Sequence, residues 1–195
     1  MKSLAHFKAA EIFVLLAMVL LLAVLTQKKE VSEKLPPVIT ISEDREEYRF
    51  KHGRSEIPPQ LLADMREKYV PLLRDESIRV GCDTVEVIGH ADESHIDKTR
   101  NDYFRDEDLI TSFSNQEVEK LIPYTNVDLG ILRALAIVQV LQEARDNGEL
   151  GEVKYLKPYS AGQLIKLDGT LTTHDTKQVD YLRRRIEIRL VKSQR

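Results

Sequence analysis

Two histidines and an aspartate stand close together near the middle of the chain, where His90, Asp92 and His95 form the pattern H-x-D-x-x-H. Imidazole and carboxylate groups are ordinary ligands for zinc, iron or manganese, so a loop that gathered these side chains could hold such an ion. The alternative is that His90 orients a turn and His95 lies in an exposed loop. We favour this alternative, and we predict neither a metal site nor a cofactor.

A second notable group is the carboxylate of Glu11, which directly precedes the unbroken apolar run 12–25. A carboxylate inside a membrane helix is costly and commonly has a function, such as carrying protons or ions within a helix bundle. Glu11 could instead sit about one turn inside the membrane edge, reach the interface and pair with Lys8. The sequence leaves both interpretations open.

The other charges and the single cysteine mainly exclude classes of function. A formal net charge of -3 gives no reason to expect a nucleic-acid partner, because phosphate binding favours a basic face. Arg184 and Arg185 are adjacent, and at the start of a strand we expect them to form structural ion pairs or to hold carboxylates near a site. The single cysteine, Cys82, cannot form an intrachain disulfide.

The apolar run predicts that the chain crosses a membrane once. Extended back to Ala9 and forward to Thr26, it approaches the roughly 20 residues that a transmembrane helix needs. We predict a short cytoplasmic tail over 1–8, a transmembrane helix over 9–26 and a semi-extended polar linker over 27–46. A cleaved signal peptide is the rival interpretation, but no small-residue cleavage site follows the run. With a cytoplasmic tail and an uncleaved transmembrane helix, the residues after the helix would lie outside the inner membrane.

Residues 47–195 contain alternating elements that predict one α+β domain. Alternating or β-branched stretches predict strands over 48–50, 84–88, 153–156 and 185–190. Apolar residues at helical spacing predict one helix from Pro58-Pro59 onward and a longer one capped by Thr125 or Asn126, and a short helix could cover 180–184. The order is βαβαβ(α)β, a sandwich with helices on one sheet face. Residues 38–41, within the predicted linker, could instead form a strand that docks on the domain.

Three segments, in order, resemble motifs of the OmpA/MotB C-terminal family of peptidoglycan-binding domains. The V-I-G-H-A-D of 87–92 is similar to the family's strand followed by a G-H-T-D turn. The N-V-D-L-G-I-L-R-A of 126–134 is similar to N-x-x-L-S-x-x-R-A, and the R-R-I-E-I of 184–188 is similar to the closing R-R-V-E-I strand. Weaker likenesses lie at 50–58, similar to the family's opening strand, and at 157–160, similar to its G-Y-G-E-S segment.

This resemblance implies a binding site for the diaminopimelate of peptidoglycan stem peptides, which carries a free ammonium and a free carboxylate. By the resemblance, Asp92 accepts the ammonium and Arg133 holds the carboxylate with its guanidinium fork. Backbone N–H groups from Asn126 to Leu129 add donors at a helix N-terminus, and His90 belongs to the same site. No nucleophile or base is required, so the implied activity is binding and not catalysis.

The chain departs from the family pattern near this implied site. Ala91 replaces the usual Thr and Gly130 replaces the usual Ser, and each change removes a hydroxyl. The insert 93–125 is longer than in the simplest family members and is rich in charge. It could cover the site, change its ligand or contact a partner, so the exact wall ligand stays open.

The order of tail, early carboxylate, single span, tether and OmpA-like domain resembles MotB-type subunits, including the ZorB-like subunits of Zorya antiviral systems. By that resemblance the chain is a homodimeric stator subunit that pairs with a multi-span MotA- or ZorA-like partner in the inner membrane. Its domain anchors the complex to peptidoglycan in the periplasm while Glu11 carries protons or sodium. The alternative is a passive wall anchor without ion flux.

Overall fold

Four strands form one mixed sheet, in the order β1-β4-β2-β3. β4 pairs antiparallel with both β1 and β2, whereas β2 and β3 run parallel. A parallel pair needs a crossover, and here the crossover contains the longest described helix, α5. The strands are β1 (Ile39–Ser42), β2 (Thr84–His90), β3 (Tyr155–Gly162) and β4 (Arg185–Val191).

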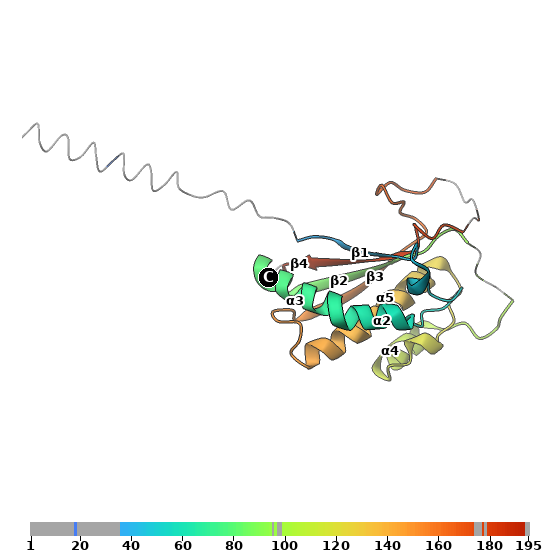
Figure 1. Cartoon of the computed structure of the whole chain (residues 1–195). Coiled ribbons are helices and arrows are strands. Elements are labelled where there is room, and N and C mark those ends of the chain that lie inside the picture. The colour runs from blue at the N-terminus through green and yellow to red at the C-terminus, as the bar shows by residue number, and fades with distance from the viewer. Residues whose placement is uncertain are drawn as a thin grey trace, which may run out of the picture. The chain divides into compact units, whose positions relative to one another are not determined.

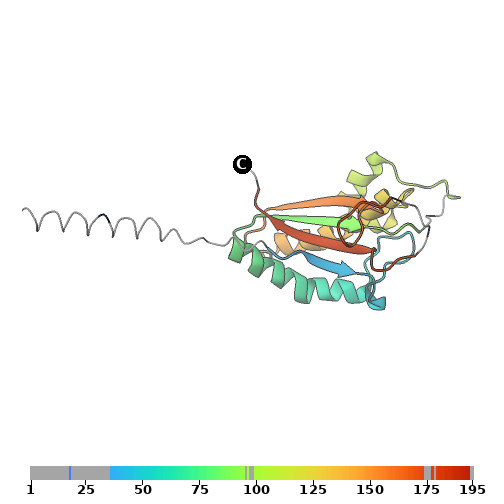
Figure 2. The same ribbon diagram turned by 90° about the horizontal axis from the view of Figure 1, so that it is seen from above.

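The main helices lie along one side of this sheet, as Figure 1 and the turned view in Figure 2 show. α2 (Pro59–Asp64) continues through a π-helical turn, Met65–Tyr69, into α3 (Val70–Val80). α5 (Asn126–Asp146) begins at the end of the sheet where β2 ends and β4 begins. The remaining elements are the 3-10 turns Glu46–Tyr48 and Val118–Lys120 and the helix α4 (Asp106–Ser114).

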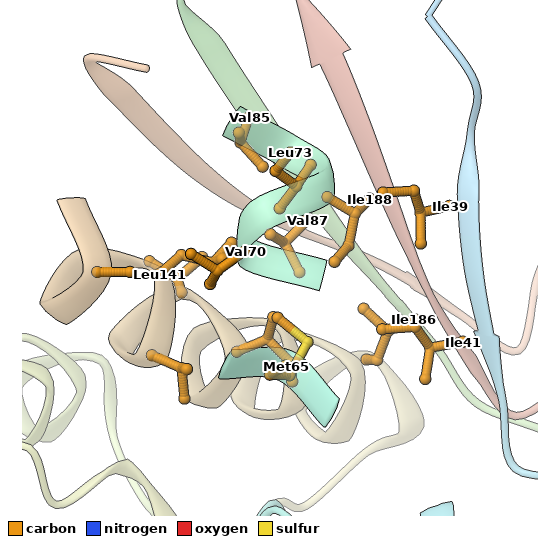
Figure 3. Close-up of a cluster of buried hydrophobic side chains, with 14 of the residues drawn as sticks. Ile39, Ile41, Met65, Val70, Leu73, Val85, Val87, Leu141, Ile186 and Ile188 are labelled. Carbon is orange, nitrogen blue, oxygen red and sulfur yellow. The ribbon is translucent and has the colours of Figure 1, made fainter. Parts of the chain in front are cut away.

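The core fills the space between sheet and helices. Figure 3 shows strand side chains facing side chains of α3, α5 and the π-helical turn. Val85, Val87 and Ile188 are fully buried and meet Leu73 and Leu141 in one cluster. The alternation of apolar and polar residues along β2 and β4 causes this arrangement, because successive side chains of a strand point to opposite faces.

This computed structural model describes residues 18, 36–94, 96, 99–173, 177 and 179–193. The residues from Pro36 to the end of the chain form one compact unit. Within the described part, no helix is both long enough and apolar enough to cross a bilayer. The predicted tail, span and first part of the linker, Glu11 among them, lie outside the described residues except for Met18.

The α+β class and helices on one sheet face are confirmed, as are the strands near 84–88 and 185–190 and both long helices. The strand predicted over 48–50 is wrong, because Tyr48 ends a 3-10 turn and its hydroxyl donates to Asp64 on α2. The first strand is β1, the alternative considered for 38–41, so the predicted linker extends too far into the folded unit.

Three further differences concern the second half of the chain. The strand predicted over 153–156 begins at Tyr155 and continues to Gly162. Residues 180–184 form a turn and not a helix, because the Asp180 carboxylate accepts hydrogen bonds from the backbone N–H groups of Leu182 and Arg183. The insert contains helix α4, whose residues pack with Val118 and Leu121 against α5. β3 and α4 depend on contacts with residues distant in sequence, whereas the turn at 180–184 depends on the hydrogen bonds of the Asp180 side chain.

Candidate functional site

The end of β2 and the start of α5 are joined by side-chain hydrogen bonds. Asn126 Nδ2 donates to the backbone carbonyl of Asp92 at 3.0 Å and lies 3.4 Å from that of Ser94. Thr125 caps α5, because its hydroxyl accepts from the Asp128 N–H while the Asp128 carboxylate accepts from the Thr125 N–H. Two of the motif segments recognised in the sequence therefore meet at this point.

Asp92 lies directly beyond β2 and is buried, with 2% of its surface exposed. Its Oδ1 accepts hydrogen bonds from the N–H and the hydroxyl of Ser94, at 3.1 and 2.5 Å. Its Oδ2 accepts the N–H of Asp180, at 2.9 Å, from the connection between β3 and β4. Both oxygens of the predicted ammonium acceptor thus have donors within the chain.

Arg133, the predicted carboxylate binder, is also buried, with 1% of its surface exposed. Its Nη1 contacts Glu43 Oε1 at 2.8 Å, and its Nε donates to the carbonyl of Arg54 at 3.1 Å. The guanidinium lies over the ring of Phe50, 4.7 Å from its centroid. Arg133 Nη2 is buried and has no hydrogen-bond partner among the described residues. The guanidinium faces the domain interior, where it contacts Glu43 and makes no ion pair with Asp92.

Glu43 is the member of this site that sequence reasoning missed. It follows β1, is 3% exposed, and places Oε1 against Arg133 and Oε2 against Arg184 Nη2 at 2.7 Å. A signal for it exists in the sequence, because Ile39, Ile41 and Glu43 stand at every second position, the spacing of residues on one side of an extended chain. The placement of 27–46 in a linker hid this alternation.

Burial dominates the electrostatics of this charged cluster. Burial raises the pKa of Glu43, although Arg133 and Arg184 attract its charge. Burial also lowers the pKa of Arg133 to about 10, against the attraction of Glu43. The ion pairs are short, yet removing their charges from water opposes much of the attraction. The cluster of Glu43, Arg133 and Arg184 is therefore charged and buried, but it does not contribute strongly to the stability of the fold.

A second charged cluster lies on the other face of β4. Glu187 accepts from Arg185 Nε at 2.9 Å and from Arg189 Nη2 at 2.6 Å, and His90 Nε2 lies 3.3 Å from its Oε1. The neighbouring His90, then Arg189 and Arg185, hold the pKa of Glu187 far below its usual range against the opposing effect of burial. Arg184 and Arg185, adjacent in sequence, thus bind different carboxylates on opposite faces of the sheet.

The remaining predicted site residues are buried rather than displayed. His90 is 1% exposed and sits opposite Arg185 in the β2–β4 register. Leu129 is 6% exposed, within the first turns of α5. No three His, Cys, Asp or Glu side chains of the described residues are placed to hold a metal ion, and His95 lies outside these residues.

The connection between β3 and β4 covers the same end of the sheet. Arg183 on this connection contacts Glu93 Oε1 through Nη1 at 2.6 Å, and its Nη2 donates to Thr172 Oγ1 at 2.8 Å. Together with the Asp180 N–H on Asp92, these contacts tie the connection to the segment directly after β2. The candidate site is therefore closed both by the residues after β1 and by the β3–β4 connection.

The chain forms an α+β domain, and its candidate site contains two buried groups of opposite charge, the carboxylate of Asp92 and the guanidinium of Arg133. No protein-family model matches the chain, and neither does any curated protein. Among solved structures, a MotB-like protein from Desulfovibrio vulgaris matches with 16% identity and a TM-score of 0.45, over 80% of this chain and 75% of that one. The periplasmic domain of Helicobacter pylori MotB matches with 13% identity and a TM-score of 0.46, over 83% and 79%.

Proposed function

We propose that this chain is an inner-membrane-anchored protein whose periplasmic domain binds peptidoglycan, with Asp92 and Arg133 as the groups that recognise the stem peptide. The observation that carries the proposal is the hydrogen bond from Asn126 Nδ2 to the Asp92 carbonyl. It joins two segments that resemble family motifs and that lie far apart in the sequence. The third segment belongs to the same place, since Arg184 shares Glu43 with Arg133 and Arg185 pairs with His90 in register.

The chemistry of these groups suits a zwitterionic ligand. A carboxylate such as that of Asp92 can accept an ammonium, and a guanidinium binds a carboxylate through two parallel hydrogen bonds. Asp92 and Arg133 come from different elements, so the two charges of the ligand would be held at separate points. Recognition of this kind requires no bond to be broken, and we propose a binding protein and not an enzyme.

Binding to purified peptidoglycan tests this proposal directly. The compact unit 36–195 is mixed with insoluble peptidoglycan and sedimented, and we expect it to appear in the pellet. Asp92→Asn and Arg133→Met should lose most of this binding. Glu43 keeps Arg184 as a partner in the second variant, which limits the damage to the fold. Matched controls are Asp146→Asn, at the far end of α5, and Arg66→Met, on the exposed side of the π-helical turn.

The controls should bind like the unaltered domain, and circular dichroism should show that every protein used is folded. Folded, unaltered domain that stays in the supernatant would contradict the wall-binding proposal. Equal binding by all variants would instead move the ligand site away from Asp92 and Arg133.

We further propose that the chain is the MotB-type stator subunit of an ion-driven complex, present in two copies beside a multi-span MotA- or ZorA-like partner. The sequence supports this with the position of Glu11 at the start of the predicted span. A role in Zorya-type antiviral defence is the narrower form of this proposal. The passive wall anchor is the competing proposal, because it needs the span only as a tether.

Glu11→Gln separates the two. The full chain is purified with its co-expressed partner, and ion flux is measured in reconstituted vesicles. The stator proposal expects flux from the unaltered complex and none from the variant, while partner and wall binding persist. If neither complex conducts, the passive anchor is favoured. If both conduct equally, the complex carries ions but Glu11 is not the group that carries them.

A further inference from the structure

We propose that Glu43 is an internal substitute for the carboxylate of the wall ligand, so that the domain keeps its own site closed until Glu43 is displaced. This inference rests on the proposed wall-binding function and names a residue that sets its affinity. Nothing in the sequence motifs pointed to Glu43, because it lies outside every segment that resembles the family.

Arg133 is buried, and Glu43 occupies part of its guanidinium. Nη1 is occupied by Glu43 Oε1 at 2.8 Å and Nε by the Arg54 carbonyl at 3.1 Å. Only Nη2 lacks a partner among the described residues, and it is buried. A ligand carboxylate that binds two N–H groups of Arg133 has to enter this buried space, where Glu43 already lies against Nη1, so we infer that it takes the place of Glu43.

Asp92, the other group of the proposed site, is also bound by a group of the chain itself. Asp92 Oδ2 accepts the backbone N–H of Asp180 at 2.9 Å, where the proposed function places a ligand ammonium. The chain thus places the carboxylate of Glu43 against the guanidinium of Arg133 and the N–H of Asp180 against the carboxylate of Asp92. These two internal groups come from different segments, the residues after β1 and the β3–β4 connection. A site for a zwitterionic ligand is closed when groups of the protein itself bind both of its charged side chains, as they do here.

Glu43 lies directly after the edge strand β1, at the border between the sheet and an exposed turn. β1 contains four residues, forms an edge of the sheet and pairs only with β4. Beyond it the backbone of Glu43 is held by its N–H on the Arg184 carbonyl at 2.9 Å and by Arg49 Nε on its own carbonyl at 3.0 Å. The residues that follow, Asp44 to Glu47, are exposed.

The energetics of the pair permit exchange. Because burial raises the pKa of Glu43 and lowers that of Arg133, the pair is held against a desolvation cost. A ligand carboxylate that makes the same contact while Glu43 returns to water replaces one buried pair by another. β1 also leads from Pro36, where the folded unit begins, to Glu43 at the site.

The first test compares Glu43→Gln with Glu47→Gln in the full chain, purified in detergent. Glutamine keeps the shape of Glu43 but cannot offer a charge to Arg133, whereas Glu47 is exposed and controls for the lost negative charge. Binding of a diaminopimelate-containing muramyl tripeptide is measured by calorimetry. We expect Glu43→Gln to bind on the order of tenfold more tightly than the unaltered chain, because its site is no longer held in the closed state, and Glu47→Gln to bind unchanged.

A folded Glu43→Gln chain that binds equally or more weakly than the unaltered chain would overturn the inference, while leaving the proposed function intact. If the unaltered chain and both variants fail to bind, the wall-binding proposal itself fails and this inference with it. A structural ion pair with no competing role predicts weaker binding in the variant, through a damaged site.

A second measurement uses the unaltered chain, so it does not depend on how well the variant folds. Hydrogen exchange is recorded for backbone amides of residues 39–46 with and without the same tripeptide. Displacement of Glu43 predicts faster exchange there on binding, although ligands usually slow exchange, and slower exchange at the start of α5. Unchanged or slower exchange over 39–46 in a chain that binds the tripeptide would refute the displacement.

Discussion

Gly89 of β2 and Gly130 of α5 touch backbone to backbone. A Cβ atom on Gly89 would lie 2.0 Å from the carbonyl oxygen of Gly130, and one on Gly130 would lie 2.8 Å from that of Gly89 and 2.3 Å from Ser160 Oγ. This close approach brings the start of α5 against the end of β2, where Asn126 reaches Asp92. A side chain at Gly130, such as the Ser of the family motif that this segment resembles, would collide with Ser160 of β3 and with Gly89 of β2.

The first prediction concerns this crossing. Gly89→Ala should lower the free energy of unfolding of the 36–195 unit by about 3 kcal/mol, because the added carbon meets backbone that cannot move aside locally. The measurement is urea-induced unfolding followed by circular dichroism. Gly169→Ala is the control: its backbone φ is +80° but nothing lies within 4 Å of its added carbon. There we expect a loss of about 1 kcal/mol from backbone strain alone. Equal losses would show that the crossing has room for a side chain.

The sequence predicted those parts of the fold that depend on local pattern. The alternation at 84–88 and 185–190, the helical spacing after Pro59 and the capping residues before Asn126 each act within a few residues of chain. The meeting of Asp92 and Asn126 followed from the motif resemblance and not from periodicity.

The remainder could not be predicted because it depends on contacts between distant segments. Tyr48 reads as a strand residue until Asp64, on α2, provides an acceptor for its hydroxyl. The ion pair between Arg133 and Glu43 could not be predicted either, because Glu43 reaches Arg133 only when β1 joins β4. Likewise, nothing near Asp180 in sequence shows that its N–H donates to Asp92.

A second prediction concerns the start of α5. Thr125→Ala removes the hydroxyl that accepts the Asp128 N–H at 3.2 Å, and it should reduce the free energy of unfolding by about 1 kcal/mol. Thr111→Ala, on the exposed surface of α4, is the matched control, because the Thr111 hydroxyl bonds only to a carbonyl of its own helix. Thermal unfolding of both variants checks the difference. If Thr111→Ala is destabilised as much as Thr125→Ala, loss of the helix cap does not explain the effect.

The third prediction tests the contact that replaced the predicted strand at Tyr48. Tyr48→Phe keeps the buried ring and deletes the hydroxyl that donates to Asp64. Asp64 keeps Lys68 at 2.8 Å and Gln60 at 3.1 Å, so we expect a loss of only about 1 kcal/mol. Tyr155→Phe, on the half-exposed start of β3, should change the stability by far less. Urea unfolding midpoints measure both, and a Tyr48→Phe domain as stable as the unaltered one would show that the hydroxyl contributes nothing.

The fourth prediction is a pH dependence centred on Glu187. Its pKa is lowered in the folded domain, so its contribution is fully present above the ordinary value of 4.5 and is lost as the pH falls below it. Glu187→Gln leaves Arg185 and Arg189 without their shared carboxylate and should cost about 3 kcal/mol at neutral pH. Below pH 4.5 the unaltered domain should lose this advantage, and the two unfolding curves should converge.

Urea unfolding of both proteins between neutral and acidic pH provides the comparison. Other carboxylates also titrate over this interval, but they are common to both proteins, so the difference in unfolding free energy isolates Glu187. Burial alone would raise the pKa of a carboxylate and produce the opposite slope. A difference that stays constant down to low pH would mean that the shape of the side chain, and not its charge between His90 and the two arginines, stabilises this face of the sheet.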